Sequence, residues 1–293
     1  MKNHIFKDVE IMRYYLDTNV VYNIKRIPDE KLTSSLISIL TLIELVSGIQ
    51  DPKSYQRRKS IVSQIFVRKM IIDWGMPEEI IFDSFDIFED YEFKDDRRQW
   101  LMNLLIALKD SENYVEYCAS AAYVNVYGHA YFKAIDDEMN MMFVLRSMMG
   151  NAFIKDSLNA NPESNSMTVD GVKYKLNTLK ELKAFFDRFP ERNHAVTINA
   201  LAAMMAKKVP EKVFPVEDIF ETYNGLINPY VSAMSQYSII KVCNHDLPAK
   251  NDFSDLTHLL YFKDFGGRKL VSDDRIFKML LGDNVISFAE FLA

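Results

Sequence analysis

Short β-type runs alternate with helical segments at the two ends of this chain, and this alternation limits the folds it can adopt. The β-type runs are Met12–Leu16, Leu36–Leu40, Lys269–Val271 and Val285–Phe288. Strands that alternate with helices form parallel sheets, because a parallel connection needs a crossover segment, which is usually a helix. We therefore predict an α/β fold in which both ends of the chain supply strands to one central parallel sheet.

The middle of the chain, residues 74–245, lacks this alternation and is mostly helix-periodic. Apolar residues recur at three- and four-residue spacing in the segments 99–108, 114–126, 136–149, 179–189 and 194–207. An Asp-Gly pair between β-type residues predicts a small hairpin near 167–176. We therefore expect a discontinuous α/β domain at 1–73 and 246–293, interrupted by a large, mostly α-helical insertion at 74–245.

Composition favours a globular protein in a reducing compartment. The 293 residues include 48% hydrophobic and 26% charged residues, which is ordinary for a folded domain. The two cysteines, Cys118 and Cys243, have neither disulfide-framework nor zinc-site spacing. The first ten residues contain no apolar stretch of the kind found in signal peptides, and runs such as Leu104–Leu108 are too short to cross a bilayer. We expect a cytoplasmic protein without a membrane partner.

Acidic residues follow the predicted strands. Asp17 comes directly after the first strand, and Glu44 lies early in the helix that follows the second. Asp273 and Asp274 come directly after the strand that ends at Val271. Because the carboxyl ends of parallel strands share one edge, where ligand crevices form, these acids can converge.

One further helix, predicted over Asp252 to Phe262, also contains acidic residues. Asp252, Asp255 and His258 lie at three-residue steps and so share one face of that helix. Several carboxylates close together stay ionised only when a cation compensates them. Hard oxygen ligands select Mg²⁺ or Mn²⁺, so the pattern indicates a site for one of these ions.

Each of these residues also has a purely local explanation. Asp17 can start a turn or cap a helix, Asp252 can be an N-cap, and Glu44 can close a capping box with Thr41. One of the adjacent pair after Val271 can likewise be a cap, and a lone histidine such as His258 is more often a supporting residue than a ligand. These explanations do not account for an acid at each strand exit.

Four segments resemble the sequence motifs of PIN domains, a nuclease family that includes many bacterial toxins. They are Tyr15–Val21, Thr41–Leu45, Asp255–Tyr261 and Leu270–Phe277, and Val285–Phe288 resembles the family's last strand. The resemblance implies a PIN-like three-layer α/β/α core with a large helical insertion between the second and third motifs, which a compact toxin lacks.

The same resemblance implies the site residues. Its catalytic metal ligands would be the acids Asp17, Glu44, Asp255 and Asp274, with Asp273 as the alternative to Asp274 and Asp252 as the alternative to Asp255. The supporting residues would be Asn19, which orients Asp17, Ser272, which supplies a hydroxyl, and His258. The cofactor would be Mg²⁺ or Mn²⁺.

The function that follows is metal-dependent endoribonuclease activity, in which metal-activated water hydrolyses phosphodiester bonds of single-stranded RNA. Arg57, Arg58 and Lys59, on a predicted helix over 53–70, are candidate RNA contacts, although a solvated basic helix face gives the same pattern. The alternative is an inactive PIN-like scaffold whose helical insertion binds a protein partner. A phosphatase of the haloacid-dehalogenase type also begins with an Asp after a strand, but it needs a second Asp where this chain has Asn19, so the sequence does not favour that function.

The net charge of −6 is unevenly distributed. Residues 1–73 and 246–293 together hold 18 Lys and Arg against 16 Asp and Glu, a net charge of +2. Residues 74–245 hold 17 against 25, a net charge of −8. The acidity therefore belongs to the insertion, which we expect to face a protein partner or a second copy of the chain rather than RNA.

Overall fold

The computed structural model describes residues 13–88, 97–128, 166–176, 178–209, 214–244, 252–263 and 267–293. These residues form two compact units. The first unit contains the described residues up to Ile80, those in 97–128, and those from His258 onward. The second contains 81–88 and the described residues from 166 to Thr257. These units divide the chain differently from the predicted boundaries, since 97–128 group with the sheet and 252–257 do not.

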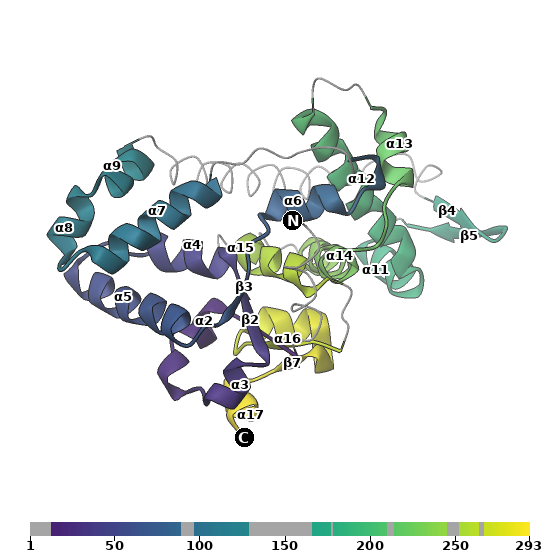
Figure 1. Ribbon diagram of the computed structural model, residues 1–293. Coiled ribbons are helices and arrows are strands. Elements are labelled where there is room, and N and C mark those ends of the chain that lie inside the picture. The colour runs from purple at the N-terminus through teal and green to yellow at the C-terminus, as the bar shows by residue number, and fades with distance from the viewer. Residues whose placement is uncertain are drawn as a thin grey trace. The chain divides into compact units, whose positions relative to one another are not determined.

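A five-stranded parallel sheet forms the centre of the first unit (Figure 1). Its strands, in spatial order, are β3 (Ile71–Asp73), β2 (Ser35–Ser38), β1 (Tyr14–Leu16), β6 (Lys269–Val271) and β7 (Val285–Ile286). Each neighbouring pair is parallel, and helices flank the sheet. This confirms the predicted α/β class. Because β1 lies between β2 and β6, both ends of the chain contribute to one sheet, as the alternation predicts.

The central strands are buried on both faces. Leu36, Ile37 and Leu270 are fully buried, as expected for strands covered by helices on each side. Strand β3 was not predicted, since residues 53–70 were expected to be helical and the helical insertion to begin at 74. This strand has only three residues and follows Lys69, whose φ of 51° turns the chain sharply after the preceding helix.

Helices and 3₁₀ turns surround the sheet of the first unit. They are α2 (Thr18–Val21), η1 (Ile24–Arg26), α3 (Asp29–Leu32), α4 (Ile39–Ser47), α5 (Pro52–Val67), α7 (Arg97–Asp110), α8 (Tyr114–Ala119), α9 (Ala121–Gly128), η3 (His258–Phe262), α16 (Arg275–Leu281), η4 (Gly282–Asn284) and α17 (Phe288–Leu292). Helix α5 begins with a capping box formed by Asp51 and Ser54. The expected closing strand ends at Ile286, because Ser287 caps α17 through the amide of Glu290.

Helix α4 begins three residues earlier than the Thr41 capping box predicts. Its N-cap is Ser38, at the end of β2, and Thr41 is a buried residue inside the helix. Glu44 therefore lies in the second turn and is not held there by a capping box. The local explanation for Glu44 is accordingly wrong.

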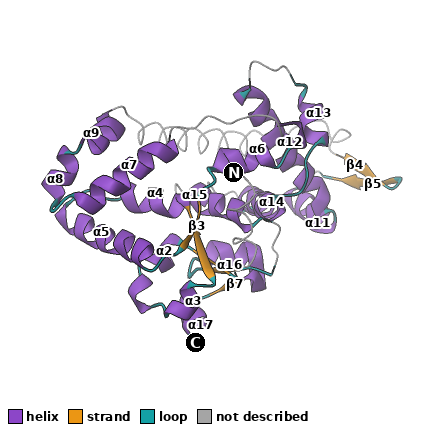
Figure 2. Ribbon diagram, viewed as in Figure 1, coloured by secondary structure: helices purple, strands orange, loops and turns teal. Residues whose placement is uncertain are grey.

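The second unit is mostly helical, as expected (Figure 2). It contains η2 (Asp86–Phe88), α11 (Leu179–Arg188), α12 (Pro190–Lys208), α13 (Val216–Glu221), α14 (Asn228–Cys243) and α15 (Asp252–Thr257), and α6 (Pro77–Asp83) passes into it from the first unit. The side-chain amide of Asn193 on α12 donates to the carbonyl of Ser235 on α14 at 2.8 Å. The predicted helix at 136–149 lies outside the described residues.

The predicted hairpin is present as the antiparallel pair β4 (Ser166–Val169) and β5 (Val172–Lys175). The two turn residues, Asp170 and Gly171, have φ values of 51° and 77°. Two consecutive positive φ values match the twist of a tight hairpin, which is why an Asp-Gly pair predicts it.

The expected helix over Asp252 to Phe262 is divided at Thr257. Helix α15 ends there, and the 3₁₀ helix η3 begins at His258, where the two units also divide. In the described part of the chain, no helix combines the length and the apolar character needed to span a membrane.

Candidate active site

Two strand exits meet at the carboxyl edge of the sheet. Because Leu16 on β1 is in register with Val271 on β6, the next residues, Asp17 and Ser272, are neighbours. The Ser272 hydroxyl donates to Asp17 Oδ2 at 2.8 Å, and both residues are buried. Ser272 Oγ in turn accepts from the amide of Asp274 at 3.1 Å, which orients the hydroxyl proton toward Asp17. The structure thus brings together two residues separated by 255 positions in sequence.

The Asp17 carboxyl group lies in an environment that disfavours its charge. Burial is the largest influence and raises the pKa of Asp17, and the negative charge of Glu44 raises it further. His258 and the hydrogen bond from Ser272 act in the opposite direction without cancelling the rise. Within the described residues, no Lys or Arg forms an ion pair with Asp17. Its ionised form therefore has no Lys or Arg partner among these residues.

A buried chain of hydrogen bonds leads from β2 to Glu44. The hydroxyl of Tyr15 lies 2.7 Å from Ser38 Oγ and 2.5 Å from His258 Nδ1. His258 Nε2 lies 3.2 Å from Glu44 Oε1. Tyr15, Ser38 and His258 are each at most 1% exposed, so their polar atoms depend on one another rather than on water.

The donors in this chain can be assigned from its two ends. An ionised Glu44 only accepts, so His258 Nε2 carries the proton that faces it. In a neutral imidazole Nδ1 is then an acceptor, and Tyr15 must donate to it. Burial raises the pKa of Tyr15 well above its ordinary value, which keeps that phenol protonated. Ser38 donates to Tyr15, and every bond in the chain has one donor and one acceptor.

His258 is therefore a supporting residue of Glu44, the role that its sequence context suggested. Tyr15 and Ser38 were not identified from the sequence, because a Tyr and a Ser in short strands are ordinary. Each of the two strands carries two hydroxyl residues, so the sequence does not distinguish Tyr15 and Ser38 from their neighbours. Asn19, which was expected to orient Asp17, is exposed, and its carbonyl accepts from Asn23 Nδ2 at 3.3 Å. In the described part of the chain its side chain makes no hydrogen bond to Asp17.

The acids after β6 both act at helix starts. Asp274 is the N-cap of α16, and its Oδ1 accepts from the amide of Ile276 at 3.0 Å. Asp273 Oδ1 accepts from the amide of Phe288, the first residue of α17, at 3.0 Å. The local capping explanation thus applies to both acids, whereas only one was expected to be a cap.

The two acids of α15 lie in the second unit, whereas Asp17 and Glu44 lie in the first. Asp252 accepts from the hydroxyl of Tyr237 and lies 3.3 Å from Lys241 Nζ. Asp255 is half-buried on the same helix. Among the residues that the structure describes, no three His, Cys, Asp or Glu side chains form a group that could hold a metal ion.

Two of the three candidate RNA contacts on α5 bind helix ends instead. Arg58 Nη1 donates to the carbonyls of Glu44 and Leu45, at 2.6 and 3.0 Å, near the end of α4. Lys59 donates to the carbonyls of Lys109 and Ser111 at the end of α7. Cations at these positions interact favourably with the carbonyls at helix ends, although the Glu44 carbonyl also accepts from the amide of Gly48 at 3.2 Å. Arg57 differs, since its guanidinium lies over the ring of Tyr22, 4.6 Å from the centroid.

Gly48, the C-cap of α4, makes room for the Arg58 guanidinium. A Cβ at this position would lie 2.1 Å from Arg58 Cζ. We expect Gly48→Ala to displace Arg58 and to lower the free energy of unfolding by about 1–2 kcal/mol, as for loss of hydrogen bonds from a charged donor. Urea denaturation measures this change. Gly48 has an ordinary φ of −84°, so alanine causes no backbone strain there.

A double-mutant cycle separates this steric effect from a general effect of alanine. In an Arg58→Met background the guanidinium is absent, so Gly48→Ala should lower the free energy of unfolding only slightly. An equal cost in both backgrounds would contradict the assigned contact.

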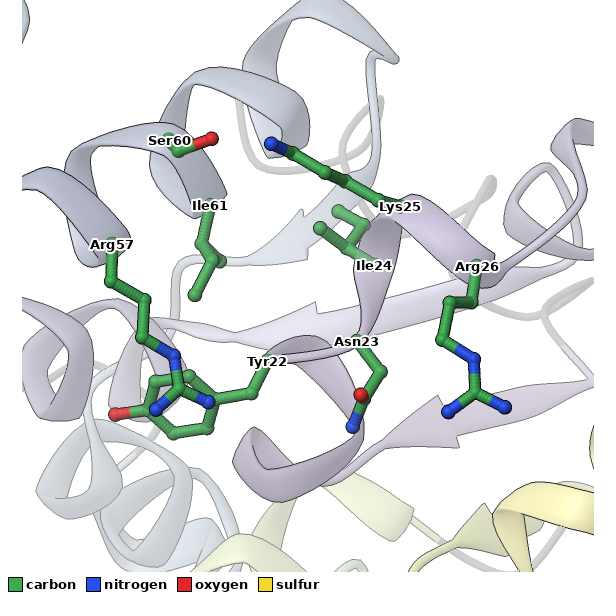
Figure 3. Close-up of a pocket in the computed structure, with 8 residues that line it drawn as sticks. All are labelled: Tyr22, Asn23, Ile24, Lys25, Arg26, Arg57, Ser60 and Ile61. Carbon is green, nitrogen blue, oxygen red and sulfur yellow. The ribbon is translucent and has the colours of Figure 1, made fainter.

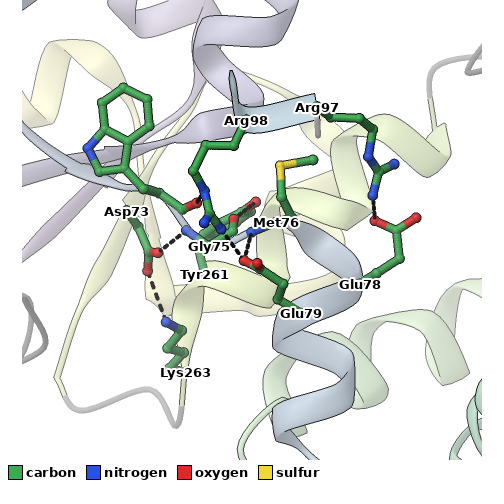
Figure 4. Close-up of polar contacts among 10 residues, drawn as sticks. Asp73, Gly75, Met76, Glu78, Glu79, Arg97, Arg98, Tyr261 and Lys263 are labelled. Atoms are coloured by element: carbon green, nitrogen blue, oxygen red, sulfur yellow. Dashed lines mark hydrogen bonds and ion pairs between the residues drawn. The ribbon is translucent and has the colours of Figure 1, made fainter. Parts of the chain in front are cut away.

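A second polar cluster lies at the exit of β3, also within the first unit (Figure 4). Asp73 Oδ1 accepts from the amide of Gly75 at 3.0 Å, and Asp73 Oδ2 lies 3.1 Å from Lys263 Nζ. Two further ion pairs join Glu78 to Arg97 and Glu79 to Arg98, linking α6 to α7. Asp73 is an acid at a strand exit that the sequence analysis did not identify. Unlike Asp17, it has a cationic partner, so this cluster is balanced in charge.

Comparisons of this chain with protein-family models, with curated proteins and with solved structures find no match. The function must therefore be argued from the site itself.

Proposed function

We propose that this protein is a metal-dependent phosphodiester hydrolase that cleaves single-stranded RNA, with Asp17 and Glu44 at its reactive centre. The observation that supports this most is the Asp17 carboxylate, which is 4% exposed and has a serine hydroxyl but no cationic side chain as its partner among the described residues. A buried carboxylate in this position is stabilised by a bound cation. The motif resemblance to PIN domains points to the same chemistry.

The residues present fit a magnesium or manganese ion. Asp17 and Glu44 supply hard oxygen donors, and Mg²⁺ commonly takes one or two carboxylates, with water and substrate phosphate as its remaining ligands. The hydroxyl of Thr18, next to Asp17, is buried without a hydrogen-bond partner in the described part of the chain. Such atoms mark positions where water or an ion completes the bonding. The resemblance adds Asp274 or Asp273, which lie in the same unit, as a further ligand.

The protein's own groups would hold the two carboxylates in place. Ser272 fixes one oxygen of Asp17, and the amide of Asp274 fixes the Ser272 hydroxyl. His258 fixes one oxygen of Glu44, and the Tyr15 hydroxyl holds the His258 ring by donating to its Nδ1. When bound, the metal ion supplies a Lewis acid that lowers the pKa of water and polarises the phosphate.

The test compares the rates at which the wild type and Glu44→Gln cleave a labelled single-stranded RNA in the presence of Mn²⁺. Glutamine keeps an oxygen that can accept from His258, so the hydrogen-bond chain survives while one charge is lost. We expect cleavage in Mn²⁺ to fall by about 100-fold or more, because a carboxylate ligand of the ion is removed.

Glu30→Gln, an exposed carboxylate on α3, is the matched control and should cleave like the wild type. Equal rates for wild type, Glu44→Gln and Glu30→Gln would overturn the proposal, since the activity would then come from a contaminant.

A non-catalytic scaffold is the second candidate, favoured by one observation. Asp273, Asp274 and Asp252 each have a protein partner, and the described residues contain no group of three metal-binding side chains. In this case the acidic helical region would bind a protein or a second copy of the chain. Calorimetric titration with Mn²⁺ discriminates: millimolar Mn²⁺ should bind a hydrolase, and no heat of binding favours the scaffold.

A further inference from the structure

A pocket of about 250 Å³ lies between η1 and α5 in the first unit (Figure 3). Three cationic side chains line it, Lys25, Arg26 and Arg57, together with the neutral polar residues Asn23 and Ser60. No carboxylate lines the pocket. The local charge is therefore positive, although the chain as a whole carries −6.

These three cations differ from three arginines of the same unit that are neutralised by carboxylates. Arg68, Arg97 and Arg98 each form an ion pair with a carboxylate. Among the described residues, Lys25, Arg26 and Arg57 form no ion pair, and their side chains donate no hydrogen bond.

Aromatic rings hold the two guanidinium groups of the pocket. Arg57 lies over the ring of Tyr22, as Figure 3 shows, and Arg26 lies 5.2 Å from the centroid of the Phe288 ring. Stacking uses the face of a guanidinium and leaves its N–H edge available to an oxygen acceptor. The two arginines are thus positioned without using their hydrogen-bond donors.

Tyr22 connects this pocket to the candidate active site. It comes directly after α2, which itself begins at the residue after Asp17. The pKa of Tyr22 is raised chiefly by burial, while Arg58 and Arg57 lower it and Glu44 raises it. The Arg58 guanidinium joins the two places: it lies 5.3 Å from the centroid of the Tyr22 ring, which lines the pocket, and it donates to the carbonyl of Glu44 at 2.6 Å.

We propose that this pocket binds a phosphate group of the RNA strand, at a nucleotide beyond the bond that is cut. Unpaired Lys and Arg side chains around a concave surface suit a multi-oxygen anion: Lys25 supplies a point charge, and Arg57 supplies a planar donor edge. Ser60 and Asn23 add neutral donors. The RNA assignment rests on the proposed function, whereas binding itself needs no catalysis.

The test measures binding without cleavage. A fluorescein-labelled 12-nucleotide oligouridylate is titrated with protein in EDTA, and anisotropy gives Kd at several salt concentrations. For Lys25→Ala/Arg57→Ala we expect Kd to rise about tenfold, and the slope of log K against log salt to fall in magnitude by about two, one per lost phosphate contact. Lys25→Arg/Arg57→Lys keeps both charges and should retain most of the affinity.

The matched control is Lys173→Ala/Lys180→Ala, which removes two exposed cations from the second unit. If only Lys25→Ala/Arg57→Ala weakens RNA binding, the result supports the pocket as a phosphate site. This conclusion holds even if no variant cleaves RNA in Mn²⁺, so a failure of the proposed hydrolase function can be told apart from a failure of the pocket proposal. Equal weakening by both pairs, or a wild type that does not bind the oligonucleotide, overturns the proposal whatever the cleavage result. Because Lys25 and Arg57 are exposed, circular dichroism should be the same for all variants.

Discussion

Asp17→Asn is expected to abolish RNA cleavage and at the same time to raise the stability of the metal-free protein at neutral pH. Asparagine keeps an oxygen that can accept from Ser272 but removes a charge that is buried without a cationic partner. The same charge that would bind the metal ion destabilises the empty site. We expect the thermal midpoint to rise by about 2–4 °C, on the order of 1 kcal/mol for a chain of this size.

The stability that Asp17→Asn gains over the wild type depends on pH, and the raised pKa of Asp17 sets the direction of that dependence. The folded pKa of Asp17 is raised above its unfolded value, so the folded state holds its proton more tightly. Wild-type stability is therefore lost as pH rises from about 4, the ordinary Asp value, through the raised folded pKa. The advantage of Asp17→Asn should be absent below about pH 4 and should grow as the pH rises through the raised folded pKa.

Thermal unfolding in EDTA between pH 4 and 8 measures the effect, with the exposed Asp283→Asn as the control for removal of one surface charge. Millimolar Mn²⁺ should stabilise the wild type and leave Asp17→Asn unchanged, since only the wild type keeps the ligand. A destabilised Asp17→Asn at pH 7 in EDTA would show that the Asp17 charge is compensated.

Tyr15→Phe is expected to cause the largest loss of stability among these substitutions. It removes the hydroxyl that joins Ser38 to His258, and both of those residues are too buried to find water. Each buried group left without a partner costs about 1–3 kcal/mol, so the total should be about 2–4 kcal/mol. The thermal midpoint should then fall by roughly 5–10 °C.

Tyr14→Phe is the matched control. Tyr14 is the adjacent tyrosine on β1, and its ring packs edge-on against Phe291 at 4.9 Å. In the described part of the chain its hydroxyl makes no hydrogen bond, so this substitution should change the midpoint little. NMR of the His258 ring should show that Nε2 keeps its proton in Tyr15→Phe, because Glu44 still accepts from it. A wild-type ring protonated at Nδ1 and not at Nε2 would contradict the assigned donor order.

Much of the fold could be predicted because its signals are local. Alternating strands and helices indicated the parallel sheet, and the Asp-Gly pair indicated the hairpin turn at Gly171. Strand β3 was missed because three residues after a long helix give too short a pattern. The start of α4 was misplaced because Thr41 and Glu44 have capping-box spacing, although burial of Thr41 inside the helix decides otherwise.

The candidate site could be predicted only in part. The position of Asp17 at a strand exit follows from the sequence, and so does its proximity to Ser272 once both strands are assigned to one edge. The roles of Arg58 and Lys59 do not, since a basic helix face looks the same whether it meets solvent, RNA or the end of another helix. Only the contacts of their amino and guanidinium groups distinguish these cases.

The sequence by itself determined the class of fold and the place of acids at its strand exits, because periodicity and turn chemistry act over a few residues. Tertiary structure alone decided which acid is left without a cation. Asp73 is paired with Lys263, 190 residues away, whereas the partner of Asp17 is a neutral hydroxyl. Strand order and register set those partners, and they depend on the packing of the whole sheet rather than on any local pattern.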